Sequence, residues 1–185
     1  MEMILDSIAA NWPIWLVSVV MIVAAVIDGM ILKVPNWLTF PFILTGWVHG
    51  MVQAGWPGLG ASLAGTAVGL MLLLIVRAVG GMGGGDVKLL AGLGAWVGVS
   101  SVWWAFVVTT FVGAIMAIVM ITMSGQWRKH YVMAHQILHE WKTVRNPEKL
   151  AAIAKERKPT MHLLPYGIPM AIGSILYFAY AGMLV

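Results

Sequence analysis

The sequence predicts an all-α integral membrane protein. Of its 185 residues, 61% are apolar and 10% are charged, and the mean hydropathy is +0.89. Soluble domains average about 45–50% apolar and about 25% charged residues, so this chain has too few charges to cover a water-soluble core. We expect one membrane-embedded domain over residues 1–185. The absence of cysteine excludes disulfides, thiolate catalysis and cysteine-ligated metal centres.

Uncharged apolar runs mark six expected membrane spans. The run Val87–Met123 is interrupted only by Lys88 and is too long for one crossing of a hydrocarbon core about 30 Å thick. We therefore divide it at Gly98–Ser101 into two helices. The other four runs are Trp12–Ile27, Trp37–Ala54, Leu59–Val76 and Leu163–Val185. Two glycine pairs with a spacing of four suit close helix–helix contact: Gly65 with Gly69, and Gly94 with Gly98.

All basic residues lie in alternate connections between these spans. Lys33 lies between the first two spans, and Arg77 and Lys88 flank the turn between the third and the fourth. The remaining eight lie between the fifth and the sixth: Arg128, Lys129, Lys142, Arg145, Lys149, Lys155, Arg157 and Lys158. Cytoplasmic loops carry the excess of Lys and Arg, so both termini are expected outside and these three connections inside.

The polar segment 126–160 is predicted to form a cytoplasmic, amphipathic helical hairpin. Its first helix carries an apolar stripe at helical spacing: Trp127, Tyr131, Ala134, Leu138 and Trp141. The second helix is expected to begin at Asn146 and to end before Pro159. Such a basic, amphipathic segment is typical of a surface that rests on the anionic inner leaflet. The confinement of the basic charge to cytoplasmic connections argues against nucleic-acid binding.

Asp28 and Asp86 are the two acidic residues that adjoin predicted spans. An aspartate at membrane depth is costly and marks a functional site by default. The predicted topology puts both at cytoplasmic helix ends, where a carboxylate pair could share a proton and activate water as in aspartic proteases. The alternative is two unrelated boundary residues that are solvated or paired with Lys33 and Lys88.

The residues around the two aspartates favour the catalytic alternative. Asp86 follows a glycine run, and glycine lets another backbone approach closely, as an extended peptide substrate requires. Asp28 is followed by Lys33 and by Pro35-Asn36, which reads as the start of the second span. No cofactor or metal is expected, since His135 and His139 lack the glutamate of a zinc-protease helix motif.

These motifs resemble those of the type IV prepilin peptidases, membrane aspartic proteases with a Gly-x-Gly-Asp motif. That motif is matched by Gly83-Gly84-Gly85-Asp86, within the longer segment Gly81–Leu89, which includes Lys88. The family's first aspartate precedes a basic residue and a Pro–Asn pair, matched by Asp28, Lys33, Pro35 and Asn36. A Pro-x-Gly at the last span is matched by Pro165-Tyr166-Gly167. The resemblance implies Asp28 and Asp86 as catalysts, and supporting roles for the other motif residues.

The resemblance implies cleavage of a prepilin leader at the cytoplasmic face of the bacterial inner membrane, ahead of the pilin's hydrophobic segment. Because the chain lacks cysteine, it is similar to the short, peptidase-only form of tight-adherence (Flp) pilus systems. Other pilus-assembly proteins are possible partners. Two further hypotheses remain: a small ion-coupled transporter with the aspartates as ion ligands, and a structural pilus-assembly subunit.

The charge pattern gives a first prediction, on topology. A single cysteine introduced near residue 56 should react with a membrane-impermeant maleimide from outside the cell. A single cysteine near residue 145 should react only from inside, because basic connections stay cytoplasmic. The measurement is labelling of intact cells against inverted vesicles, and the reverse pattern would refute the topology.

Overall fold

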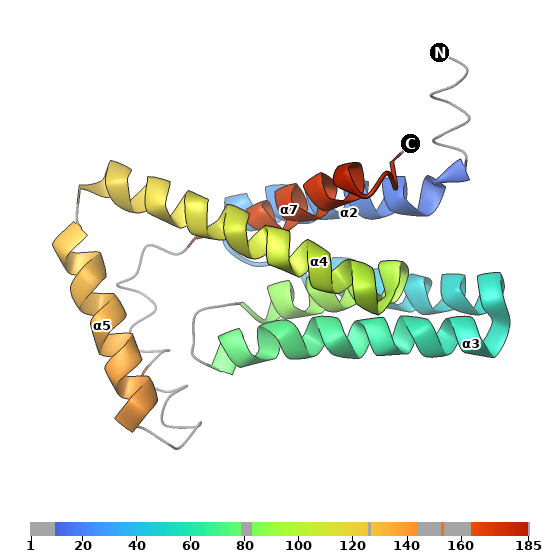
Figure 1. Cartoon of the computed structure of the whole chain (residues 1–185), viewed down its shortest axis with the longest axis horizontal. Helices are drawn as coiled ribbons and strands as arrows, with labels where there is room; N and C mark the ends of the chain where they lie inside the picture. The colour runs from blue at the N-terminus through green and yellow to red at the C-terminus, as the bar shows by residue number, and fades with distance from the viewer. Residues whose placement is uncertain (1–9, 79–82, 126, 144–152, 154–163, 185) are drawn as a thin grey trace, which may run out of the picture.

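The described part of the chain is entirely helical apart from short connections. The structure, a computed structural model, describes residues 10–78, 83–125, 127–143, 153 and 164–184. Three helices in this part are long and apolar enough to cross a membrane. The helices are α2 (Trp12–Ile31), α3 (Asn36–Ala78), α4 (Gly84–Ser124), α5 (Trp127–Thr143) and α7 (Gly167–Tyr180) (Figure 1). The predicted fold class, an all-α membrane protein, is confirmed at this level.

Glycines break the two longest helices. In α3 the backbone leaves the helical region at Ala54 and Gly55, and Figure 1 shows the chain reversing there into a hairpin. In α4 it does so at Gly98 alone, so Ser100 and Ser101 belong to the following helix rather than to a turn. Gly55 and Gly98 have φ values of +62° and +76°, a region that glycine adopts without a steric penalty. The first break follows the expected end of the run Trp37–Ala54, and the second lies where the run Val87–Met123 is divided.

The glycine pairs lie where the second half of α3 meets the first half of α4. A Cβ on Gly65 would collide with the carbonyl oxygen of Gly94, and a Cβ on Gly94 would collide with that of Gly65. A Cβ on Gly69 would lie 2.9 Å from the Leu90 carbonyl carbon. The two backbones are therefore in direct contact, as the four-residue spacing predicts.

Helix α7 packs against both α2 and α4. The shared core is aliphatic and aromatic, and its fully buried members include Val17, Met21, Leu93, Met170 and Phe178. A Cβ on Gly173 would lie 2.5 Å from the Thr109 Cα, so α7 and α4 also approach with little between them. This packing brings the start of α7 to the last turn of α2.

Two elements differ in extent from the prediction. Helix α2 continues one turn past Ile27 to Ile31 and is capped by Leu32, whose φ is +52°. Helix α7 is shorter than the expected run Leu163–Val185, because Pro165 disfavours helical backbone at the residue before it and Gly182 adopts a positive φ at the other end. At 14 residues it is about 21 Å long.

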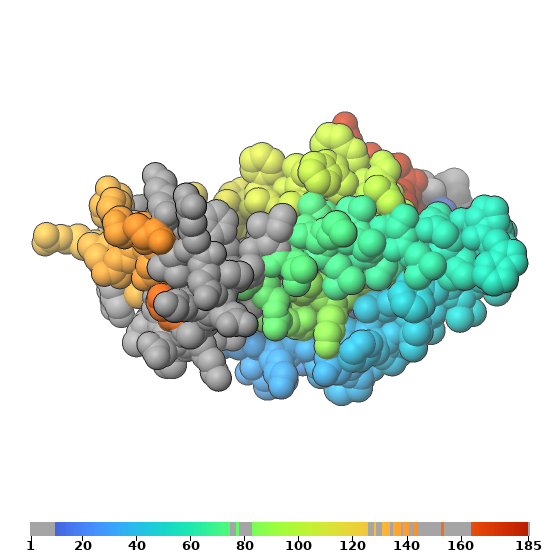
Figure 2. All heavy atoms as spheres, turned by 90° about the horizontal axis from the view of Figure 1, so that it is seen from below, coloured from blue at the N-terminus to red at the C-terminus, as the bar shows by residue number. Residues whose placement is uncertain are grey.

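Of the predicted hairpin, the structure describes the first helix. Helix α5 lies across the end of the bundle (Figure 1) and occupies the opposite end of the molecule from the α3 turn (Figure 2). Tyr131 is exposed, and the side chains of the other stripe residues lie outside what the structure describes. The expected second helix, apart from Ile153, also lies outside the described residues.

The α3–α4 contact gives a second prediction. Gly94→Ala should lower the free energy of unfolding by about 1–3 kcal/mol, because the new methyl group meets backbone that cannot move aside. Gly60→Ala is the matched control, since a Cβ there has no neighbour within 4 Å. Thermal unfolding in detergent micelles measures both, and equal melting temperatures for the two variants would contradict the close packing.

Candidate active site

Asp28 is buried in the last turn of α2 and is bound by the start of α7. Only 2% of its surface is exposed, because it follows Val17, Met21 and Ala24 at helical spacing on the core face of α2. The backbone N–H of Gly167 donates a 2.8 Å hydrogen bond to Asp28 Oδ2. A Cβ on Gly167 would lie 2.9 Å from the Asp28 Cβ. The predicted Pro-x-Gly therefore ends in a glycine that contacts the first aspartate directly.

Asp86 is buried in the first turn of α4. It is 6% exposed, and its Oδ2 accepts a 3.2 Å hydrogen bond from the backbone N–H of Gly83. This is the reciprocal half of a capping box, in which an acidic residue at the third helical position bonds back to the N-cap backbone. A Cβ on Gly83 would lie 3.1 Å from the same oxygen. The Gly83–Asp86 segment thus forms one compact helix start.

Gly84 and Gly85, which lie between Gly83 and Asp86 in the chain, have different neighbours. A Cβ on Gly85 would collide with the carbonyl oxygen of Val34 and would lie 2.9 Å from the Val34 Cβ. A Cβ on Gly84 would meet only the guanidinium end of Arg77, a long and flexible side chain. Gly85 is therefore the position where the segment after α2 touches the start of α4. A side chain at this position would not fit.

Three of the predicted supporting residues, Lys33, Asn36 and Lys88, line one cavity with Asp86. The Lys88 ammonium donates a 2.9 Å hydrogen bond to Asn36 Oδ1 and lies 4.5 Å from the centre of the Phe40 ring. The Pro35 carbonyl accepts the first N–H groups of α3, from Leu38 and Thr39. Lys33 is exposed nearby. The Pro–Asn pair does begin the second helix, and Lys88 ties that beginning to α4.

A cavity of about 510 Å³ opens beside Asp86. Cationic side chains of Lys33, Arg77 and Lys88 line it together with Gly83–Asp86. Asp28 is not among its described lining residues. The structure thus brings the residues predicted around Asp86 to one cavity, and holds Asp28 at the neighbouring start of α7.

Tyr166 links the surroundings of the two aspartates and was not singled out from the sequence. It precedes Gly167, its hydroxyl is hydrogen-bonded to the Thr110 side chain, and Asp86 acts on it electrostatically. Its place inside Pro165-Tyr166-Gly167 was the available signal. Thr110 lies in an uninterrupted apolar run, and no local pattern could have marked it.

Comparison with known proteins identifies the family. The family model described as the type IV leader peptidase family matches residues 15–119, more than half of the chain. The chain belongs to this family. The matched region contains Asp28, Asp86 and the motif residues around each of them, whereas Pro165 and Gly167 lie beyond it.

Curated relatives of this type IV leader peptidase family member carry one name, prepilin leader peptidase/N-methyltransferase. The protein from Neisseria gonorrhoeae is 33% identical over 107 residues, which are 54% of this chain and 37% of that protein. The protein from Xanthomonas campestris is 36% identical over 101 residues, or 51% and 35% of the two chains. The chain spans less than two fifths of the length of these relatives. No solved structure matches it significantly.

The Gly85–Val34 contact gives a third prediction. In a Val34→Cys background, where the new thiol is the chain's only one, Gly85→Ala should raise the rate of maleimide labelling several-fold. Val34 is 2% exposed, and the added methyl group must push its backbone away from α4. Gly84→Ala is the matched control and should leave the rate unchanged, because Arg77 can swing aside. Equal labelling in both variants would remove the role assigned to Gly85.

Proposed function

We propose that the chain is a membrane aspartic endopeptidase that cleaves the leader peptide of type IV prepilins. The single observation that carries this proposal is that two aspartates within the family match are buried near the start of α7, where Gly167 binds Asp28 and Asp86 acts electrostatically on Tyr166. Burying a carboxylate in an apolar bundle costs free energy, and residues that carry this cost mark a functional site by default. Asp28 and Asp86 are the proposed catalytic residues.

In the proposed reaction the two carboxyl groups act as a pair. One accepts a proton from water as the water oxygen attacks the scissile carbonyl, and the protonated partner polarises the carbonyl oxygen. The proton then passes to the leaving amine. The apparent pKa values of such a pair belong to both members, so the roles are assigned to the pair rather than to either residue.

The glycines ahead of Asp86 support a substrate in an extended conformation. Gly83, Gly84 and Gly85 border the Asp86 cavity without side chains of their own, so a substrate backbone can approach there. Lys33 and Lys88 are proposed as orienting or headgroup-contacting residues, and Pro165 and Gly167 as supports for Asp28. No cofactor or metal ion takes part in this proposal.

We further propose six membrane spans with both termini outside and the site at the cytoplasmic face of the bacterial inner membrane. The breaks at Gly55 and Gly98 support this, because each divides a helix that is too long for one crossing. Asp28 and Asp86 then lie at cytoplasmic span ends. Helix α5, with the rest of 126–160, would rest on the anionic inner leaflet.

The proposed substrate is a prepilin of the Flp type, with a leader followed by a hydrophobic segment. The absence of cysteine and the resemblance to short family members support this class. Other pilus-assembly proteins are proposed as neighbours in the membrane. The transporter and structural hypotheses become outcomes of the experiment below.

The fourth prediction concerns catalysis. In membranes incubated with a leader-bearing prepilin, Asp28→Asn and Asp86→Asn should each slow cleavage by about 10²–10⁴-fold, the usual size of a lost acid–base contribution. Glu140→Gln on α5 makes the same carboxylate-to-amide change and should cleave normally. Denaturing gel electrophoresis of the prepilin measures the loss of the leader. Equal cleavage by all variants would exclude the dyad, and none by the wild type would favour a transporter or structural subunit.

A further inference from the structure

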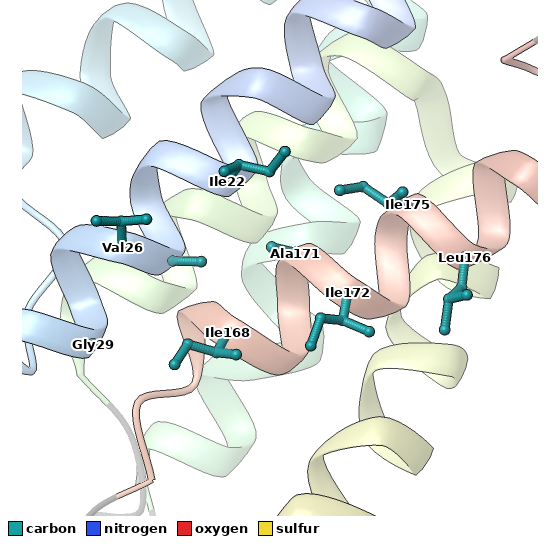
Figure 3. A pocket seen from close by; sticks show the side chains of 9 residues that line it. Ile22, Val26, Gly29, Ile168, Ala171, Ile172, Ile175 and Leu176 are labelled. Atoms are coloured by element: carbon teal, nitrogen blue, oxygen red, sulfur yellow. The ribbon is translucent and has the colours of Figure 1, made fainter.

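An apolar groove runs between α2 and α7 on the outer surface of the bundle. Its volume is about 510 Å³, and each of its lining residues is aliphatic or glycine. Figure 3 shows the side chains of Ile22 and Val26 from α2 and of Ile168, Ile172 and Ile175 from α7 along the two helices. A groove without any polar group binds an apolar partner that satisfies its own backbone hydrogen bonds, and in a membrane such a partner is a helix.

One end of this α2/α7 groove adjoins the proposed catalytic Asp28. The lining residue Gly29 follows Asp28 in the chain, and the lining residue Ile168 follows Gly167, whose N–H binds the Asp28 carboxylate. The Ile168 Cδ1 atom lies 3.5 Å from the position of a Cβ on Gly29. Asp28 itself is buried and is not a lining residue, so this end of the groove is formed by the chain neighbours of Asp28 and of its hydrogen-bond donor Gly167.

The groove extends away from Asp28 along the spans. From Gly29 to Ile22 it follows α2 for about 10 Å, or two helical turns. Ala25 and Ala171 also line it, and small residues let a third helix approach two others closely. The groove thus has the apolar character and the direction that a helix starting near Asp28 would need.

We propose that the α2/α7 groove binds the hydrophobic helix of the prepilin substrate, which brings the peptide bond ahead of that helix to Asp28. The inference rests on the proposed function, in which the scissile bond immediately precedes a hydrophobic segment. With the start of that segment at Gly29, the rest of it lies along the groove within the membrane, and the leader extends to the cytoplasmic side. Continuity with the Asp28–Gly167 contact favours this occupant over a lipid chain or a second copy of the protein.

A crosslinking experiment tests the occupant. A benzophenone amino acid at Val26 in the Asp86→Asn variant should form an adduct with uncleaved prepilin on irradiation in membranes. The matched control is the same probe at Val119 on α4, which is outside the groove and similarly exposed, 48% against 57% for Val26. An adduct at Val26 and none at Val119 supports the proposal. Adducts only with lipid, or a crosslinked dimer of the protein, would overturn it.

Kinetics separate this inference from the proposed function. Val26→Phe should lower kcat/KM for prepilin about tenfold, equivalent to about 1.4 kcal/mol of lost binding, mainly through KM. Val119→Phe, with the same change of residue type, should stay within about twofold of the wild type. If the wild type cleaves prepilin and Val26→Phe is unaffected, the groove does not bind the prepilin helix, and the proposed peptidase function still holds. If the wild type does not cleave prepilin, the proposed function fails. The crosslinking experiment alone then decides whether the groove binds the prepilin helix.

Discussion

The direct backbone contact between Gly65 and Gly94 limits where α4 can lie. With no side chain between the two helices, α4 cannot move closer without a collision, and it cannot move away without leaving a void in a packed interior. The start of the same helix is held in the same manner by Gly85 against Val34. Asp86 lies between these two contacts, so its position follows from rigid backbone rather than from adjustable side chains.

The two aspartates depend on different parts of the chain. Asp86 is bound by Gly83, three residues away, so this hydrogen bond forms whenever the first turn of α4 is folded. Asp28 is bound by Gly167, 139 residues away, so its surroundings exist only once α7 has docked. Residues along α7 that never touch a substrate therefore influence Asp28, whereas Asp86 is sensitive to changes near its own glycines.

The sequence predicts the helices and the approximate site better than it predicts the contacts. The apolar runs, the gap between Ala54 and Leu59 and the excessive length of Val87–Met123 suffice for the helices and their breaks, because these features are local. The charge alternation predicts that Asp28 and Asp86 lie at one membrane face. The N–H of Gly167 on Asp28 and the bond of Tyr166 to Thr110 could not be predicted, since both arise from the docking of α7.

Two kinds of glycine requirement coexist in the chain, and chirality separates them. At Gly65 and Gly94 an added Cβ collides with the backbone of the facing helix. At Gly55 and Gly98 an added Cβ has no neighbour within 4 Å, and the obstacle is the positive φ. A D-alanine introduced there by semisynthesis has its own favoured extended conformation at these angles. It would narrow the unfolded ensemble and stabilise each turn by about 0.4–1 kcal/mol, the usual gain when a compatible glycine becomes alanine. Ribosomal synthesis offers only L-residues, which leaves glycine as the one encoded residue that makes both turns without strain.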